Sequence, residues 1–203
     1  KNLKKSGNKF KTLNNMLFVF SAPSGSGKTT IVKEILKQYP EFHFSISATS
    51  RKKRDCETDK KDYFFITKEE FEEKIKNDEF VEYELIYDKN YYGTLKSQVD
   101  DCLKNGHCMV FDMDVKGALS IKRIYGDKSL LIFVNPPDKE AIIQRLKNRG
   151  TETEETLKKR IARIDFEMAK KDEFDYVVNN DDLQQAVEDA KKIINKYYNK
   201  EQK

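Results

Sequence analysis

The sequence of 203 residues is poor in the residues that mark specialised folds. It contains no tryptophan, 4 prolines and 8 glycines, so collagen-like and low-complexity classes are excluded. Its 3 cysteines, Cys56, Cys102 and Cys108, show no CxxC or Cys/His spacing. The sequence therefore predicts neither a disulfide framework nor a zinc site, and we expect a reducing, cytoplasmic setting.

Long hydrophobic runs are also missing. No segment provides the roughly 18 consecutive apolar residues that a membrane-spanning helix needs. Residues 1–15 are rich in Lys and Asn and lack the apolar centre of a secretory signal. We therefore expect no membrane partner. Hydrophobic residues at 37% and charged residues at 36% instead indicate a water-soluble, helix-rich domain, long enough to fold alone with a small insertion.

The positive net charge is confined to the first residues. The formal charge of +4 includes five lysines, with no acidic residue, within residues 1–15. The remaining chain holds 34 basic against 35 acidic residues, a net charge of −1. We interpret residues 1–15 as a disordered basic tail or an expression remnant. The rest offers no broad basic surface, so we expect no nucleic-acid partner and look for local anion sites.

Apolar patterning predicts an α/β fold. Residues 16–20 form a continuous apolar run, which is typical of a strand buried on both faces of a parallel sheet. Similar runs occur at residues 108–111, 130–134 and 176–178, each followed by a helical pattern. The clearest helical pattern places apolar residues on one face between Leu183 and Tyr197. We expect a mainly parallel sheet flanked by helices.

Two segments interrupt this alternation. Residues 47–99 are polar and tyrosine-rich, with a short helix that Thr67 and Glu70 begin as a capping box. Residues 144–171 carry arginines around a polar turn and a helix with a single apolar stripe. We predict that 47–99 is an inserted subdomain and that 144–171 is a lid. The core then comprises residues 16–46, 100–143 and 172–203.

A phosphate-binding loop follows the first predicted strand. Residues 22–29 read Ala-Pro-Ser-Gly-Ser-Gly-Lys-Thr, close to the pattern G-x-x-x-x-G-K-S/T, with Ala22 in place of the first glycine. In such loops backbone N–H groups surround phosphates, the lysine reaches the β- and γ-phosphates, and the hydroxyl ligates magnesium. The alternative, a glycine turn beside a chance lysine, is disfavoured by the strand before and the helix after. The predicted ATP-binding residues here are Ser24, Gly25, Ser26, Gly27, Lys28, Thr29 and Thr30.

A magnesium site beside this loop needs an acid at the end of a neighbouring strand. Asp112 and Asp114 follow the apolar run 108–111 and point to the same side of an extended chain. Their alternative role is to cap the next helix. We expect Thr29 and Asp112 to hold Mg²⁺.

A second anion site is predicted in the insertion. Arg51 and Arg54 follow a run of small hydroxyl residues, and Tyr63 comes nine residues later. Guanidinium forks suit a dianionic phosphate, and a tyrosine hydroxyl adds a neutral donor. The acceptor of a phosphoryl group therefore has a candidate binding site.

At this point the sequence resembles the guanylate kinase family from about Met16 to Tyr197. The resemblance lies in several motifs that occur in order. They are the loop 22–29, Ser47 with Arg51 and Arg54, Asn90–Thr94, Asp112–Gly117, Arg149–Glu155 and Asn180–Asp182. Lys116 departs from the pattern, because the family usually has glutamine there.

The resemblance implies a P-loop NTPase-type core, a GMP-binding insertion and a helical lid. It places the GMP phosphate on Arg51, Arg54, Tyr63 and Tyr92. Guanine would be read by Ser47, Glu82 and Thr94, with Gly93 beside them and Asp114 near the base. On alternation alone, Glu82 would be interpreted as facing solvent.

The resemblance also implies how ATP is handled. Arg145, Arg149 and Arg160 would close with the lid onto the transferring phosphoryl group, and Asn180 would contact ATP. Without the resemblance, we would interpret the lid arginines as forming ion pairs with nearby glutamates. Lys28 and Arg51 join the lid arginines as the residues expected to act in catalysis. The expected partners are ATP, with Mg²⁺, and GMP, and the expected state is a monomer or a weak dimer.

Two other classes compete with this interpretation. Guanylate-kinase-like scaffold modules keep the fold but typically lose the phosphate loop, whereas Gly27, Lys28 and Thr29 are present here. A P-loop kinase for another nucleoside monophosphate is disfavoured by Ser47 and Glu82.

Overall fold

The central sheet is a five-stranded parallel sheet. A computed structural model describes residues 15–86, 89–138, 140, 142 and 154–198 of the chain, without the side chains of residues 86 and 154–160. The strand order is β2-β7-β1-β8-β9, and every neighbouring pair is parallel. The bounds are β1 Leu17–Ser21, β2 His43–Phe44, β7 Met109–Met113, β8 Ser129–Asn135 and β9 Tyr176–Asn179. The expected mainly parallel sheet is confirmed.

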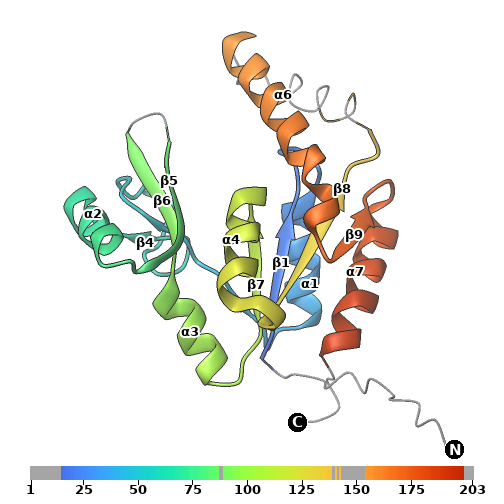
Figure 1. Ribbon diagram of the computed structural model, residues 1–203, viewed down its shortest axis with the longest axis horizontal. Helices are drawn as coiled ribbons and strands as arrows, with labels where there is room; N and C mark the ends of the chain where they lie inside the picture. Colours follow the sequence, from blue (N-terminus) through green and yellow to red (C-terminus); the bar gives the residue numbers. More distant parts are fainter. Residues whose placement is uncertain (1–14, 87–88, 139, 141, 143–153, 199–203) are drawn as a thin grey trace, which may run out of the picture.

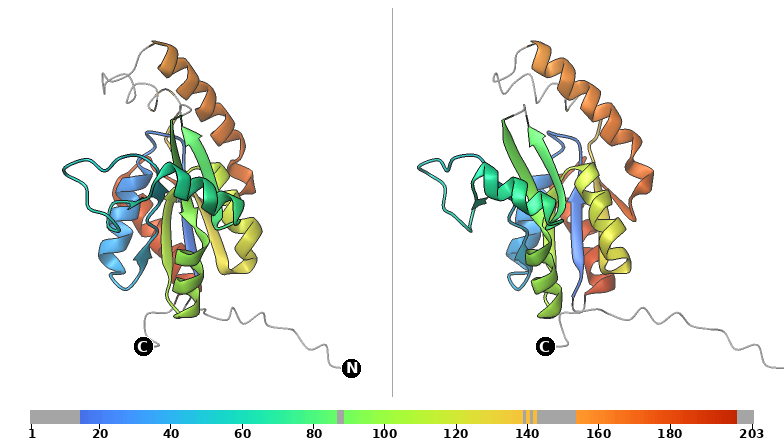
Figure 2. Two further views of the ribbon diagram at one scale, coloured as in Figure 1. Left: turned by 90° about the vertical axis from the view of Figure 1, so that its left-hand side faces the viewer. Right: turned by 60° about the vertical axis from the view of Figure 1, so that its left-hand side comes forward.

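Helices cover both faces of this sheet (Figures 1 and 2). Phe18 and Phe20 of β1 pack with residues of α1 (Lys28–Gln38) and α7 (Leu183–Tyr197). Leu17 and Val19 point the other way, into a cluster with α3 (Lys96–Lys104) and α4 (Val115–Tyr125). Because side chains alternate along a strand, a strand covered on both faces must be apolar throughout. This explains the uninterrupted run at residues 16–20.

A second, mixed sheet lies beside the core, to the left in Figure 1. Its strand order is β4-β3-β6-β5. The α2 helix (Lys68–Lys76) packs against it through the fully buried Phe71, and the predicted capping box of Thr67 and Glu70 is present. The strands are β3 Ala48–Thr49, β4 Phe64–Phe65, β5 Phe80–Ile86 and β6 Asn90–Leu95. All of them lie within the predicted insertion, although its predicted boundary at residue 99 falls inside α3.

The α6 helix (Glu154–Ala169) rises beyond the carboxyl edge of the core sheet (Figure 2). Its predicted apolar stripe is used near its foot, where the buried Ile164 packs with Ile142 and Met168. Two short 3₁₀ helices, η1 (Gly126–Lys128) and η2 (Lys171–Glu173), precede β8 and β9. The division of the chain into moving subdomains stays a prediction.

Two further expectations concern the basic tail and membrane-spanning helices. Residues 1–14 of the predicted tail lie outside the described residues, whereas Asn15 donates to the Leu103 carbonyl at 3.3 Å and accepts from Lys128 Nζ at 2.9 Å. None of the helices that the structure describes has both the length and the apolar character to cross a bilayer.

Phe71 provides a test of the second sheet. Its ring is stacked on Phe80 and Tyr91, with centroid distances of 4.2 and 5.0 Å. We expect Phe71→Ala to lower the free energy of unfolding by about 3–5 kcal/mol, because it leaves a cavity in a small apolar cluster. Urea unfolding measures this. The control Phe44→Ala removes a ring that is 43% exposed and should cost less than about 1 kcal/mol; equal losses would contradict the expectation.

Candidate functional site

The phosphate loop connects β1 to α1. Gly25 and Gly27 have φ angles of 91° and 87°, in the left-handed region that favours glycine. A Cβ atom on Gly27 would lie 2.4 Å from Asn180 Nδ2, which donates to the Ser26 carbonyl at 2.7 Å. Asn180, which was expected to contact ATP, thus holds the backbone of the phosphate loop through this hydrogen bond. The backbone N–H groups in the first turn of α1 lie beside this loop. The N-terminus of a helix attracts anions, so the loop is suited to phosphate.

Lys28 and Thr29 meet Asp112 at the carboxyl edge of the sheet. Lys28 Nζ forms an ion pair with Asp112 and donates to the Met113 carbonyl at 2.8 Å. The Thr29 hydroxyl donates to Asp112 Oδ2 at 2.6 Å. A hydroxyl and a carboxylate side by side are hard oxygen donors of the kind that Mg²⁺ prefers, so the residues fit this ion. Among the described residues, no cluster of three or more His, Cys, Asp or Glu side chains could hold a metal ion by itself.

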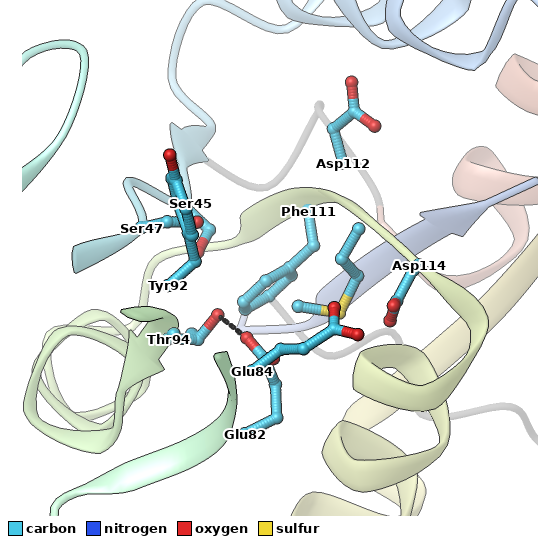
Figure 3. A pocket seen from close by; sticks show the side chains of 11 residues that line it. Ser45, Ser47, Glu82, Glu84, Tyr92, Thr94, Phe111, Asp112 and Asp114 are labelled. Atoms are coloured by element: carbon cyan, nitrogen blue, oxygen red, sulfur yellow. Dashed lines mark hydrogen bonds between the residues drawn. The ribbon is translucent and has the colours of Figure 1, made fainter. Parts of the chain in front are cut away.

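A cavity opens between the two sheets. We call it the second cavity, because the phosphate loop is the first candidate binding site. The second cavity has a volume of about 150 Å³ and includes Asp112 in its wall, so it adjoins the phosphate loop. Figure 3 shows Tyr92, Thr94 and Glu82 on the side of the second sheet, facing Asp112 and Asp114. The lining residues are Ser45, Ser47, Glu82, Glu84, Tyr92, Gly93, Thr94, Phe111, Asp112, Met113 and Asp114.

Glu82 is a partly buried acid of this cavity. Its Oε1 accepts from the Thr94 hydroxyl at 2.8 Å (Figure 3). Burial raises the pKa of Glu82 to about 7, and the negative charges of Asp114 and Glu84 act in the same direction. The strands carrying this pair approach closely, because a Cβ on Gly93 would lie 2.7 Å from the Glu82 carbonyl oxygen. The solvent-facing interpretation from alternation alone is therefore wrong.

Asp112 and Asp114 line one cavity but have separate partners. Asp112 contacts Lys28 and Thr29, as described above. Asp114 follows the last residue of β7 and caps α4, with Oδ1 accepting from the Gly117 N–H at 2.8 Å. Its Oδ2 accepts from Arg163 of α6 at 2.6 Å. The helix-capping alternative is thus realised by Asp114 and the loop contact by Asp112.

Arg51 lies against a carboxylate that the sequence did not point to. Its two terminal nitrogens donate to Glu57 Oε2 and Oε1 at 2.8 and 2.7 Å. Its guanidinium also lies 5.3 Å from the ring centroid of Tyr63 and 5.5 Å from that of Phe65. The hydrogen bonds that Arg51 donates to Glu57 raise the pKa of Arg51 and lower the pKa of Glu57 to about 2. This arrangement holds the Arg51 fork in a single orientation.

The remaining predicted residues are placed as follows. Tyr63 and Tyr92 lie edge to face, with centroids 6.0 Å apart, so Arg51 and both tyrosines are brought together. The Arg54 side chain is exposed, and the backbone N–H of Arg54 donates to Glu57 Oε2 at 2.8 Å. Ser24 is exposed in the loop, and Thr30 is exposed in the first turn of α1. Arg145 and Arg149 lie outside the described residues, and Arg160 belongs to α6 with its side chain also outside them.

Among the residues that sequence reasoning missed at or near the site are Ser45, Glu57, Glu84 and Arg163. Ser45 carries no signal beyond its position after a short strand. Glu57 stands three residues after Arg54 and six after Arg51, a spacing that could have suggested an ion pair. Arg163 has no local signal, because its partner Asp114 is 49 residues away.

A phosphate loop that shares Asp112 with a second polar cavity defines a class of protein, the P-loop kinases of nucleoside monophosphates. Comparisons with known proteins narrow this class. The sequence profile described as Guanylate kinase matches residues 14–197. The chain belongs to the guanylate kinase family, as its motifs indicated.

Individual relatives agree with this assignment. The chain is 47% identical over 191 residues to a guanylate kinase of Bacteroides thetaiotaomicron, a match that covers 94% of each chain. It is 47% identical over 172 residues to a guanylate kinase of Chlorobaculum tepidum, covering 85% of this chain and 88% of the relative. The crystal structure of guanylate kinase from Anaplasma phagocytophilum superposes with a TM-score of 0.68 at 26% identity, covering 89% of this chain and 84% of that one.

Glu57 yields a prediction about the acceptor site. Glu57→Gln keeps the size of the side chain but removes the charge that orients Arg51. We expect the KM for GMP, the acceptor implied by the family, to rise about 10-fold, with little change in the KM for ATP. Steady-state kinetics measure both. Glu69→Gln, an exposed glutamate on α2, is the control; an unchanged KM for GMP would show that Arg51 is oriented without Glu57.

Glu82 yields a prediction about pH. With a pKa of about 7, the carboxyl is mostly protonated at pH 6 and ionised at pH 8. Only the ionised form accepts hydrogen bonds through both oxygens, so the KM for GMP should fall up to about 10-fold from pH 6 to pH 8. The GMP phosphate also titrates near pH 6. Glu82→Gln shares that titration, so a wild-type profile with the same pH dependence as that of the variant would contradict the role of the carboxyl.

Proposed function

We propose that this chain transfers the γ-phosphoryl group of ATP to GMP, giving ADP and GDP. The single observation that carries the proposal is the double role of Asp112. It contacts Lys28 and Thr29 of the phosphate loop and also lines the second cavity. A donor phosphate on the loop and an acceptor in the cavity would therefore meet beside one carboxylate, as in-line transfer requires.

On the acceptor side, Arg51, Arg54, Tyr63 and Tyr92 bind the GMP phosphate. Guanine offers N1–H and N2–H₂ as donors and O6 as an acceptor. In this proposal the Glu82 carboxylate accepts from the donors, and the hydroxyls of Ser47 and Thr94 complete the recognition. A site built on such hydrogen bonds rejects a base that leaves them unpaired, by up to about 10⁴–10⁵. Adenine, which lacks the N2 amino group, would be rejected in this way.

On the donor side, the loop N–H groups and Lys28 bind the ATP phosphates. Lys28 leaves Asp112 for the β- and γ-oxygens, and Asp112 keeps its contact with Thr29. Thr29 and Asp112 would hold Mg²⁺, which supplies neutralisation of the phosphate charge when bound. Ser26 Oγ is buried with no hydrogen-bond partner among the described residues, and its hydroxyl is available to this loop site.

Residues 144–171 act as a lid in this proposal. The α6 helix contains Arg160, and residues 144–171 also include Arg145 and Arg149. Closure would bring these arginines to the transferring phosphoryl group and exclude water that could otherwise accept it. Residues 47–99 would move towards the core as GMP binds.

We also propose that the enzyme is cytoplasmic and works as a monomer or a weak dimer. Cys102 and Cys108 are buried free thiols, which suits a reducing compartment. Light scattering on the purified protein tests the oligomeric state.

A coupled assay of ADP release tests the reaction. We expect turnover with GMP and dGMP, and rates at least about 10²-fold lower with AMP, UMP and CMP. Lys28→Met should reduce kcat by about 10²-fold or more, because it removes charge stabilisation at the transferring group. EDTA should abolish turnover, and added Mg²⁺ should restore it. Turnover of AMP at the GMP rate would contradict the assignment of the base site.

A further inference from the structure

Arg163 connects three parts of the molecule beside the second cavity. We call this cavity the acceptor cavity, because the proposed function places GMP in it. On α6, the Arg163 guanidinium donates to Asp114 Oδ2 at 2.6 Å and to Glu167 Oε1 at 3.1 Å. Glu84 Oε2 of β5 lies 3.7 Å from the same terminal nitrogen that contacts Asp114. We call Glu84, Asp114 and Glu167 the carboxylate trio. Its members come from the second sheet, the core and α6, so one cation links the elements on both sides of the cavity to the lid.

The contact fixes Asp114. One carboxylate oxygen accepts from the Gly117 N–H at the start of α4, and the other accepts from Arg163. Both oxygens therefore have defined partners, and the orientation of the carboxylate depends on where α6 lies. A second contact joins the same helices, since Lys116 Nζ lies 5.8 Å from the ring centroid of Phe166. The start of α4 and the foot of α6 are thus held together at two points.

Arg163 also compensates charge. Glu82, Glu84 and Asp114 all line the acceptor cavity, which in the proposed reaction receives a dianionic nucleotide. Glu167 is only 4% exposed, and its burial raises its pKa while Arg163 opposes that effect. Without Arg163 the carboxylate trio would repel the incoming phosphate and also each other. Such repulsion would act on the acceptor more than on ATP, whose loop Arg163 does not contact in the described structure.

We infer that Arg163 is a positioning residue for GMP, which acts through Asp114 and Glu84 and couples the lid helix to the acceptor cavity. This inference rests on the proposed function. Arg163 is distinct from the lid arginines expected to reach the phosphoryl group, because two of its three partners, Asp114 and Glu84, line the acceptor cavity. It aligns the walls of the cavity and lowers their negative charge before GMP enters.

The test compares KM values with kcat in the full-length enzyme. We expect Arg163→Ala to raise the KM for GMP about 10-fold, with the KM for ATP changed less than about 2-fold and kcat less than about 3-fold. Arg163→Lys keeps the charge but loses the fork, so its KM for GMP should lie between those of Arg163→Ala and wild type. Lys170→Ala removes an ion pair with Glu173 at the foot of α6, away from the cavity, and should match wild type.

A double variant separates positioning from structural support. Glu84→Gln removes one charge of the carboxylate trio, so Arg163→Ala/Glu84→Gln should have a lower KM for GMP than Arg163→Ala alone. Loss of folded protein would instead lower apparent kcat at unchanged KM, which circular dichroism and thermal unfolding would register. If Arg163→Ala does not fold, Arg163→Lys against wild type provides the same KM comparison.

The outcomes that overturn the inference are distinct. Equal KM values for GMP in wild type and Arg163→Ala would remove the role of Arg163 while leaving the proposed function intact. Equal increases in the KM values for GMP and ATP would do the same. A wild-type enzyme without GMP turnover would overturn the proposed function and the inference together.

Discussion

The parallel pairing of β1 with β7 is the constraint on which both sites depend. The register places Phe20 opposite Asp112 and Ser21 opposite Met113, so the phosphate loop leaves one strand where the carboxylates leave its neighbour. Ligand sites in parallel α/β sheets form at this edge because the carboxyl ends of the strands converge there. The second sheet and α6 lie around the same edge, where they contribute the second cavity and, in the proposed function, the lid.

Charges around the site occur in compensated sets. Lys28 lies against Asp112, Arg51 against Glu57, and Arg163 against Asp114. A cation that is already paired loses less on dehydration than a bare one, and its side chain is already ordered. In the proposed function an arriving phosphate would meet side chains that are already ordered, and Lys28 would exchange Asp112 for it.

The sequence was informative where a signal is local. Continuous apolar runs predicted the core strands, because strands covered on two faces cannot alternate, and the loop between residues 22 and 29 was visible from its glycines and Lys28. Glu82 was misplaced by alternation alone, since its part of β5 packs against α4 of the core, with Glu82 close to Gly117. Arg163 could not be predicted, because its partners Asp114 and Glu84 are distant in the chain and only the packing of α6 on α4 brings them together.

The central position of β1 also makes its native contacts distant in sequence. Leu17 pairs with Met109 on one side and Ser129 on the other, and no strand close in sequence is available to it. The loop that follows is supported by Asn180, which lies 154 residues further along. Contacts this distant in sequence form slowly, because a long stretch of chain must be ordered before they can form. The phosphate loop therefore gains its native support only when β7, β8 and Asn180, all far along the chain, are in place.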